Sequence, residues 1–143
     1  MTFKSKHISV SINCLADKVY EFASNPENLP RWAAELGGSI KNVNGDWIAE
    51  SPMGRIKVKF AEKNKFGILD HEVTLPSGAK FYNPMRVFPN NDGSELIITL
   101  YRQPEMSDQM FAQDAEAVTR DLEKLKTLFE ESSSNIVRVN SIS

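Results

Sequence analysis

Two polar residues interrupt strand faces that are otherwise apolar, and they are the first candidates for chemistry. His71 occupies one place in the alternating stripe Leu69, His71, Val73 and Leu75. Because alternate residues of a strand point to the same side, the imidazole is predicted to face the interior. A neutral imidazole there could orient a ligand carbonyl or act as a general base, which makes His71 the best catalytic candidate. The alternative is a core histidine that bonds a neighbouring side chain.

Asn83 is the second exception, in the stripe Phe81, Asn83, Met85 and Val87. A buried amide must find hydrogen-bond partners, and a ligand could supply them. The alternative is that Asn83 lies at a bulge or forms a hydrogen bond between strands. The pair Asn83-Pro84 also indicates a break, so the alternation need not continue through it. If Met85 faces inward, Arg86 faces outward, and we interpret Arg86 as a surface residue.

Aromatic and apolar residues complete the predicted ligand-binding set. Trp32 is expected in the packing of a helix pair or at the mouth of a cavity, because large aromatic residues usually pack in cores. Tyr101 either donates a hydroxyl or covers apolar surface, and the pattern does not decide which face of its strand lies inside. Phe111 begins the apolar side of a long helix. The full predicted set is Trp32, His71, Asn83, Met85, Tyr101 and Phe111.

Other kinds of site find little support in the sequence. The two histidines and the single cysteine, Cys14, do not have the spacing of a metal site, and we interpret Cys14 as structural. The sequence has no glycine-rich phosphate loop and no nucleophile-elbow motif. We therefore expect no metal and no cofactor, and the sequence does not decide whether any reaction is catalysed.

Composition limits the classes of partner. The chain has 143 residues, 41% of them hydrophobic and 25% charged, which fits one domain with a real core. Its net charge is -2, so no electrostatic argument favours nucleic acid. No apolar run approaches the roughly 20 residues that cross a membrane, and we expect no membrane insertion. Without a signal-peptide pattern, and with one cysteine, the protein is predicted to be cytoplasmic.

The candidates are carried by a succession of strands and helices. An alternating strand at 8–12 precedes two short helices, at 15–23 and from 28 to about 36, the second ended by Gly37-Gly38. Six strands joined by short turns follow, at 40–43, 47–50, 55–60, 66–75, 80–88 and 95–102. Such short connections require antiparallel neighbours. On the strand at 55–60, Arg55, Lys57 and Lys59 are interpreted as a solvated outer face. On the strand at 66–75, the more polar stripe that includes Asp70 is likewise predicted to face water.

The last predicted element is a helix over 107–131. It carries an apolar stripe on one side, and Ser107 is its predicted N-cap. The stripe consists of Phe111, Ala115, Val118, Leu122, Leu125 and Phe129. The Ser/Asn-rich residues 132–143 are predicted to form a C-terminal tail, disordered or packed on a neighbour.

This order of elements resembles the START-like superfamily, also called SRPBCC, and its polyketide cyclase/dehydrase-like members. The similar stretches are Val-Tyr-Glu-Phe to Asn-Pro-Glu-Asn-Leu-Pro-Arg-Trp at 19–32, Gly-Ile-Leu-Asp-His-Glu-Val at 67–73, and Gly-Ser-Glu at 93–95. The resemblance implies an α+β helix-grip fold. A seven-stranded curved antiparallel sheet would wrap around the C-terminal helix, with two short helices between its first two strands. Residues 1–131 would form one such domain, with an apolar cavity between sheet and helix.

Three functions follow from this reading. The first is binding or transport of a small hydrophobic molecule, such as a lipid, a polyketide or an aromatic compound. The alternative is a polyketide cyclase/dehydratase-type enzyme that acts in the same cavity. The third is an interaction protein with a vestigial cavity. The sequence does not decide whether the protein forms a homodimer.

Overall fold

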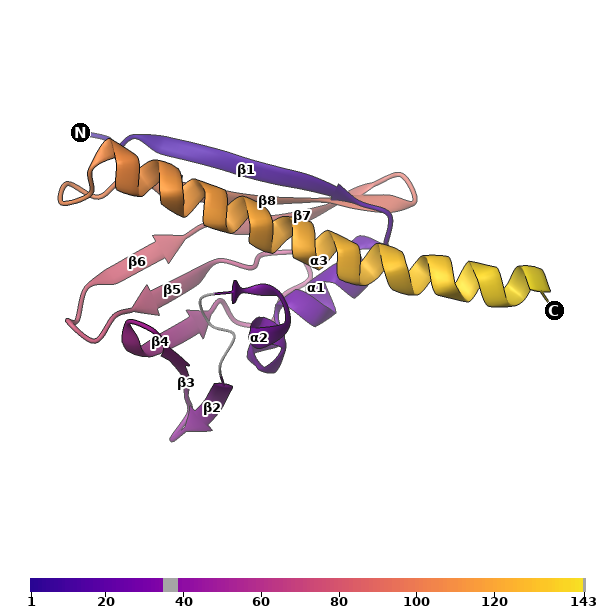
Figure 1. Ribbon diagram of the computed structural model, residues 1–143, viewed down its shortest axis with the longest axis horizontal. Coiled ribbons are helices and arrows are strands. Elements are labelled where there is room, and N and C mark those ends of the chain that lie inside the picture. Colours follow the sequence, from indigo (N-terminus) through magenta and orange to yellow (C-terminus); the bar gives the residue numbers. More distant parts are fainter. Residues whose placement is uncertain (35–38, 143) are drawn as a thin grey trace.

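The computed structural model describes residues 1–34 and 39–142 of the chain. The predicted end of the second short helix, at Leu36 and Gly37-Gly38, lies outside the described residues. The helices and strands of the chain follow one another in the order shown in Figure 1. They are β1 (Ser5–Ile12), α1 (Ala16–Ala23), a 3-10 turn (Pro26–Asn28), α2 (Leu29–Trp32), β2 (Ser39–Val43), β3 (Asp46–Ser51), β4 (Gly54–Phe60), β5 (His71–Thr74), β6 (Lys80–Asn83), β7 (Met85–Asn90), β8 (Gly93–Tyr101) and α3 (Asp108–Ile142).

The strands confirm an α+β fold with antiparallel pairing, but the predicted single seven-stranded sheet is wrong. Within the described residues, eight strands form a three-stranded sheet of order β1-β8-β7 and a five-stranded sheet of order β2-β3-β4-β5-β6. The extra strand arises at Pro84, which has no N–H to donate and divides the predicted strand 80–88 into β6 and β7. The carbonyl of Pro84 accepts instead from the N–H of Thr99, at 2.9 Å.

The segment before β5 joins the two sheets. The predicted strand 66–75 is regular only from His71, because the preceding residues turn toward β7. There the Leu69 N–H donates to the Met85 carbonyl (2.8 Å) and the Val87 N–H donates to the Gly67 carbonyl (3.0 Å). Gly67 has φ of +70°, and a Cβ at this position would lie 2.2 Å from the Val87 oxygen. A glycine is therefore required where the chain passes from one sheet to the other.

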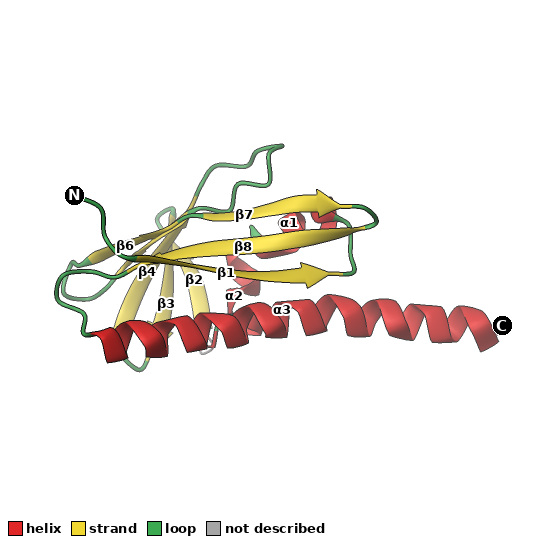
Figure 2. Cartoon of the chain, turned by 90° about the horizontal axis from the view of Figure 1, so that it is seen from above, coloured by secondary structure: helices red, strands yellow, loops and turns green. Residues whose placement is uncertain are grey.

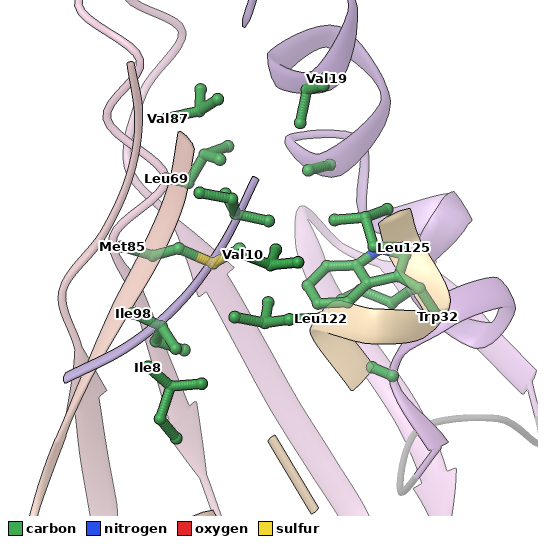
Figure 3. Close-up of a cluster of buried hydrophobic side chains, with 14 of the residues drawn as sticks. Ile8, Val10, Val19, Trp32, Leu69, Met85, Val87, Ile98, Leu122 and Leu125 are labelled. Carbon is green, nitrogen blue, oxygen red and sulfur yellow. The ribbon is translucent and has the colours of Figure 1, made fainter. Parts of the chain in front are cut away.

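The core lies between the three-stranded sheet and one side of α3. Leu96, Ile98 and Leu100 are the buried alternation of β8, which settles the face that the sequence left open. On α3, the predicted stripe supplies Phe111, Ala115, Leu122 and Leu125 as buried residues, whereas Val118 and Phe129 are partly buried. In Figure 3 the indole of Trp32 lies beside Leu122 and Leu125. The short helix α2 is thus packed onto the middle of α3.

Helix α3 begins as predicted and ends later. The Ser107 hydroxyl accepts from the N–H of Met110 at 3.1 Å, which confirms the N-cap. The helix continues past 131 to Ile142, and Figures 1 and 2 show it running alongside β1 and extending beyond the sheet. Lys126 donates to the Ser11 carbonyl (2.6 Å), and Glu130 accepts from the N–H of Asn13 (3.0 Å). Among the described helices, none is long and apolar enough to cross a membrane.

Candidate functional site

A cavity of about 770 Å³ lies between the five-stranded sheet, the end of β8, α2 and α3. One wall is apolar and comes from strands, with Ile56 and Val58 of β4, Val73 of β5 and Phe81 of β6. These side chains face inward because β4 alternates as predicted, with Arg55 and Lys59 exposed on its other face. This volume lies within the usual range for small-molecule sites.

Helix α3 forms the opposite wall and gives the cavity its length. Lining residues extend from Met110 to Leu122, twelve residues apart, which corresponds to about 18 Å along a helix. The rim near the start of α3 is open, because Met110 is 52% exposed and Met53, in the turn between β3 and β4, is 54% exposed. An elongated molecule could therefore enter beside the first turn of α3.

The two polar exceptions of the sequence meet on the sheet wall. His71 of β5 and Asn83 of β6 are directly paired across the strands, and both line the cavity. Cross-strand partners point to the same side of a sheet, so the hairpin register brings the imidazole and the amide together. The Nδ2 atom of Asn83 lies 3.5 Å from Nε2 of His71. Phe60, the partner of His71 on β4, packs against the imidazole with ring centroids 5.1 Å apart.

Hydrogen bonding determines the tautomer of His71. Its Nδ1 lies 3.0 Å from the carbonyl oxygen of Leu69, which can only accept, so Nδ1 carries the proton. Burial lowers the pKa of His71, although the Leu69 carbonyl and the Asp70 carboxylate favour the charged ring. The imidazole is therefore neutral near pH 7, and Nε2 presents a lone pair.

Asp70, predicted to face water, is buried, and this prediction was wrong. Its carboxylate accepts from the Met85 N–H (2.8 Å), from Arg86 (3.2 and 3.0 Å) and from the Tyr82 hydroxyl (2.7 Å). Burial raises the pKa of Asp70, but these hydrogen bonds outweigh it and hold the pKa below its ordinary value. The bond to Asp70 in turn raises the pKa of Tyr82 and that of Arg86. The cluster fixes the junction of β5, β6 and β7 behind His71.

The predicted ligand-binding residues divide into two groups. Trp32, His71, Asn83 and Tyr101 all line the cavity. Met85 and Phe111 are instead packed in the core, 1% and 5% exposed. The indole Nε1 of Trp32 is sealed from solvent and has no hydrogen-bond partner among the described residues.

Sequence reasoning missed the polar part of the helix wall. Gln113, Asp114, Arg120 and Asp121 line the cavity, although none of them belongs to the predicted apolar stripe. Spacing could have found the first two, since Gln113 and Asp114 lie three and four positions beyond Met110 and share its side of the helix. Asp121 has a structural contact as well, because its carboxylate accepts from the N–H of Ala34 just after α2 (3.1 Å).

The described part of the chain has no candidate metal-binding site. Among the residues that the structure describes, no group of three or more His, Cys, Asp or Glu side chains could hold a metal ion. Cys14 is a free, half-buried thiol two residues after β1, outside the cavity lining. The described lining residues offer hydrogen bonding, charged groups and apolar contact, and His71 can accept a proton.

Comparison with known proteins identifies the fold. No family model matches the sequence, and no curated protein matches it either. Solved structures do match: XoxI from Bacillus cereus has a TM-score of 0.74 at 16% identity, over 93% of this chain and 99% of that one. A START superfamily protein from Mycobacterium smegmatis has a TM-score of 0.65 at 14% identity, over 89% of this chain and 97% of that one.

The chain has the START-like, helix-grip fold. A further match to this helix-grip architecture is DynU16, a protein of the dynemicin biosynthetic locus, with a TM-score of 0.68 at 13% identity. That likeness covers 88% of this chain and 47% of DynU16. At such identities the shared property is the fold, and the chemistry must be argued from this chain's own cavity.

Proposed function

We propose that this helix-grip protein binds or carries a small hydrophobic molecule, such as a lipid, a polyketide or an aromatic compound. The observation that carries the proposal is the cavity of about 770 Å³, whose largely apolar strand wall includes the inward polar pair of His71 and Asn83. Ligand sites commonly combine apolar walls with a few placed polar groups. Burial of apolar ligand surface would supply most of the affinity, and His71 and Asn83 would fix one end.

Trp32 offers a direct test, because it is one of only two tryptophans and lines the cavity. Trp47, the other, lies on β3 outside the cavity lining. In a Trp47→Phe variant, fluorescence reports Trp32 alone, and its emission should change on titration with a bound lipid or aromatic probe. In the matched Trp32→Phe variant, which keeps Trp47, the same titration should change the emission little.

Native mass spectrometry of freshly purified protein complements the titration. A co-purified small molecule would support the proposal and give its chemical class. Two negative results together would reject it: protein free of small molecules, and Trp32 emission unchanged by lipids, polyketides and aromatic compounds alike.

The second candidate is an enzyme of the cyclase/dehydratase type. It is favoured by the neutral imidazole of His71, whose Nε2 lone pair could accept a proton inside the cavity. DynU16, which shares the fold, belongs to a biosynthetic locus. Incubation with linear polyketone thioester analogues should then give cyclised product, and His71→Ala should slow its formation. Equal rates for both proteins would reject His71 as the base.

The setting of the protein is also a proposal. A cytoplasmic location is supported by the single cysteine, which is free and can form no internal disulfide. A homodimer is the one assembly that the sequence left open, and a solution mass measurement distinguishes it from a monomer.

A further inference from the structure

The hydrogen-bonding capacity of His71 is already half used. Its Nδ1–H donates to the Leu69 carbonyl of its own chain segment at 3.0 Å, and that bond is buried. Phe60 covers one side of the ring at a centroid distance of 5.1 Å. The remaining polar atom is Nε2, on the edge that approaches Asn83, and it can only accept a hydrogen bond while the ring is neutral.

The present partner of Nε2 is a weak one. Asn83 Nδ2 lies 3.5 Å away, which is at the outer limit of a hydrogen bond and well beyond the usual 2.9–3.0 Å. Asn83 is only half-buried, whereas His71 is 9% exposed. A ligand group that approaches Nε2 more closely would therefore lose little by displacing this contact.

Resting on the proposed function, we infer that the ligand carries a hydroxyl group, phenolic or alcoholic, which donates its hydrogen to His71 Nε2 and accepts one from the Asn83 amide. The pairing uses both capacities of a hydroxyl, which is a donor and an acceptor on one atom. Val58 and Ile98, both at most 5% exposed, line the cavity nearby, so an unpaired polar group here would be costly.

The inference excludes several groups at this end of the cavity. A carbonyl or an ether oxygen presents only lone pairs, so it would face the lone pair of Nε2 without a hydrogen between them. A carboxylate would bring a negative charge to a neutral imidazole and a neutral amide, and neither of these two groups can neutralise it. A long-chain acid would accordingly bind with its carboxylate elsewhere, whereas a phenol or an alcohol fits.

Matched ligand pairs test the inference. The probes are 2-naphthol against 2-methoxynaphthalene, and 4-phenylphenol against 4-methoxybiphenyl, with Kd measured by calorimetry. In the wild-type protein each hydroxyl compound should bind about threefold to tenfold more tightly than its ether, as one net hydrogen bond allows. In His71→Phe, which keeps a ring but has no acceptor, this ratio should fall to about one.

His7 supplies the control. It lies on the exposed side of β1, where its Nδ1 contacts Thr99, and it is not part of the cavity lining. His7→Phe should keep the wild-type ratio of hydroxyl to ether affinity.

The outcomes separate the two proposals. If ethers bind the wild-type protein as tightly as hydroxyl compounds, the inference is overturned while ligand binding stands. If neither class binds and Trp32 fluorescence responds to no probe, the proposed function fails and the inference with it. Should His71→Phe not fold, nitrogen-15 NMR of the wild-type protein decides: 2-naphthol should move the Nε2 resonance more than 2-methoxynaphthalene does. Equal movement, or a proton on Nε2 in the free protein, would overturn the inference.

Discussion

The Asp70 carboxylate accepts two hydrogen bonds, of 3.2 and 3.0 Å, from the Arg86 guanidinium. The next residue in the chain is His71, which lines the cavity. Asp70 and His71 are consecutive, so their side chains leave the chain on opposite sides. The carboxylate faces β7, where it also accepts from the Met85 N–H, and the imidazole faces the cavity. One dipeptide thus joins the two sheets on one side and presents the best candidate for chemistry on the other.

Removal of the Asp70 carboxylate should destabilise the fold. Asp70→Ala leaves the buried Met85 N–H without its acceptor and Arg86 without its partner, and we expect a loss of about 2–3 kcal/mol in the free energy of unfolding. The control is Glu50→Ala, which removes an ion pair with Arg55 whose side chains are 60% and 67% exposed. That change should cost at most about 1 kcal/mol. Urea unfolding measures both, and equal losses would show that the Asp70 cluster is no more than a surface contact.

Gly67 should tolerate no side chain. Gly67→Ala would place a Cβ 2.2 Å from the Val87 carbonyl oxygen, so the junction between the sheets must shift, and we expect a loss of about 3 kcal/mol or more. Gly78→Ala is the matched control, because Gly78 also has a positive φ, of +90°, but open space around its Cβ position. Backbone strain alone should cost about 1–2 kcal/mol there. Thermal and urea unfolding of the two variants would contradict the close contact at Gly67 if their losses were the same.

The stability of the protein should fall on mild acidification because of His71. Burial lowers its folded-state pKa below the value of about 6.5 expected for the unfolded chain. Between these two pKa values the unfolded state binds more protons, so the free energy of unfolding rises with pH there and reaches its full value above about 6.5. Unfolding in urea at pH values from about 7 down to about 5 should show this slope in the wild-type protein and a smaller one in His71→Phe. Identical slopes would mean that the imidazole is not held neutral.

Filling the cavity from α3 should block binding without loss of fold. Ala117 lines the cavity between Met110 and Leu122, whereas Ala112 is exposed and is not part of the lining. Ala117→Phe should therefore weaken binding of an aromatic probe by roughly tenfold or more, equivalent to at least about 1.4 kcal/mol. Ala112→Phe should leave the affinity unchanged. Far-ultraviolet circular dichroism would confirm that both variants keep their helices, and undiminished binding by Ala117→Phe would place the ligand elsewhere.

Local periodicity predicted the elements that bury one face. The alternation in β1 and β4 and the apolar stripe of α3 follow from single-chain spacing, and the structure confirms them. The stripe nevertheless led to Phe111 as a ligand contact, whereas its neighbour Met110 lines the cavity. Successive helical residues point about 100° apart, so the face that packs against the sheet and the face that borders the cavity overlap only in part, at Val118 and Leu122.

What the sequence could not supply is register between strands. His71 and Asn83 were recognised separately as polar exceptions, but their pairing depends on how β5 and β6 align. The burial of Asp70 depends likewise on Tyr82 and Arg86, 12 and 16 residues further on. The division at Pro84 shows the opposite case, since the loss of one N–H is visible in the sequence even though its result, a second sheet, is not.

The walls of the cavity differ from one another, and this difference bears on chirality. The strand wall presents apolar side chains beside the His71–Asn83 pair, and the opposite wall on α3 presents Gln113 and Asp121. Three unlike contacts at fixed positions on two facing walls cannot all be satisfied by a molecule and by its mirror image. If the natural ligand has a stereocentre near its hydroxyl group, the protein is expected to bind one enantiomer in preference to the other.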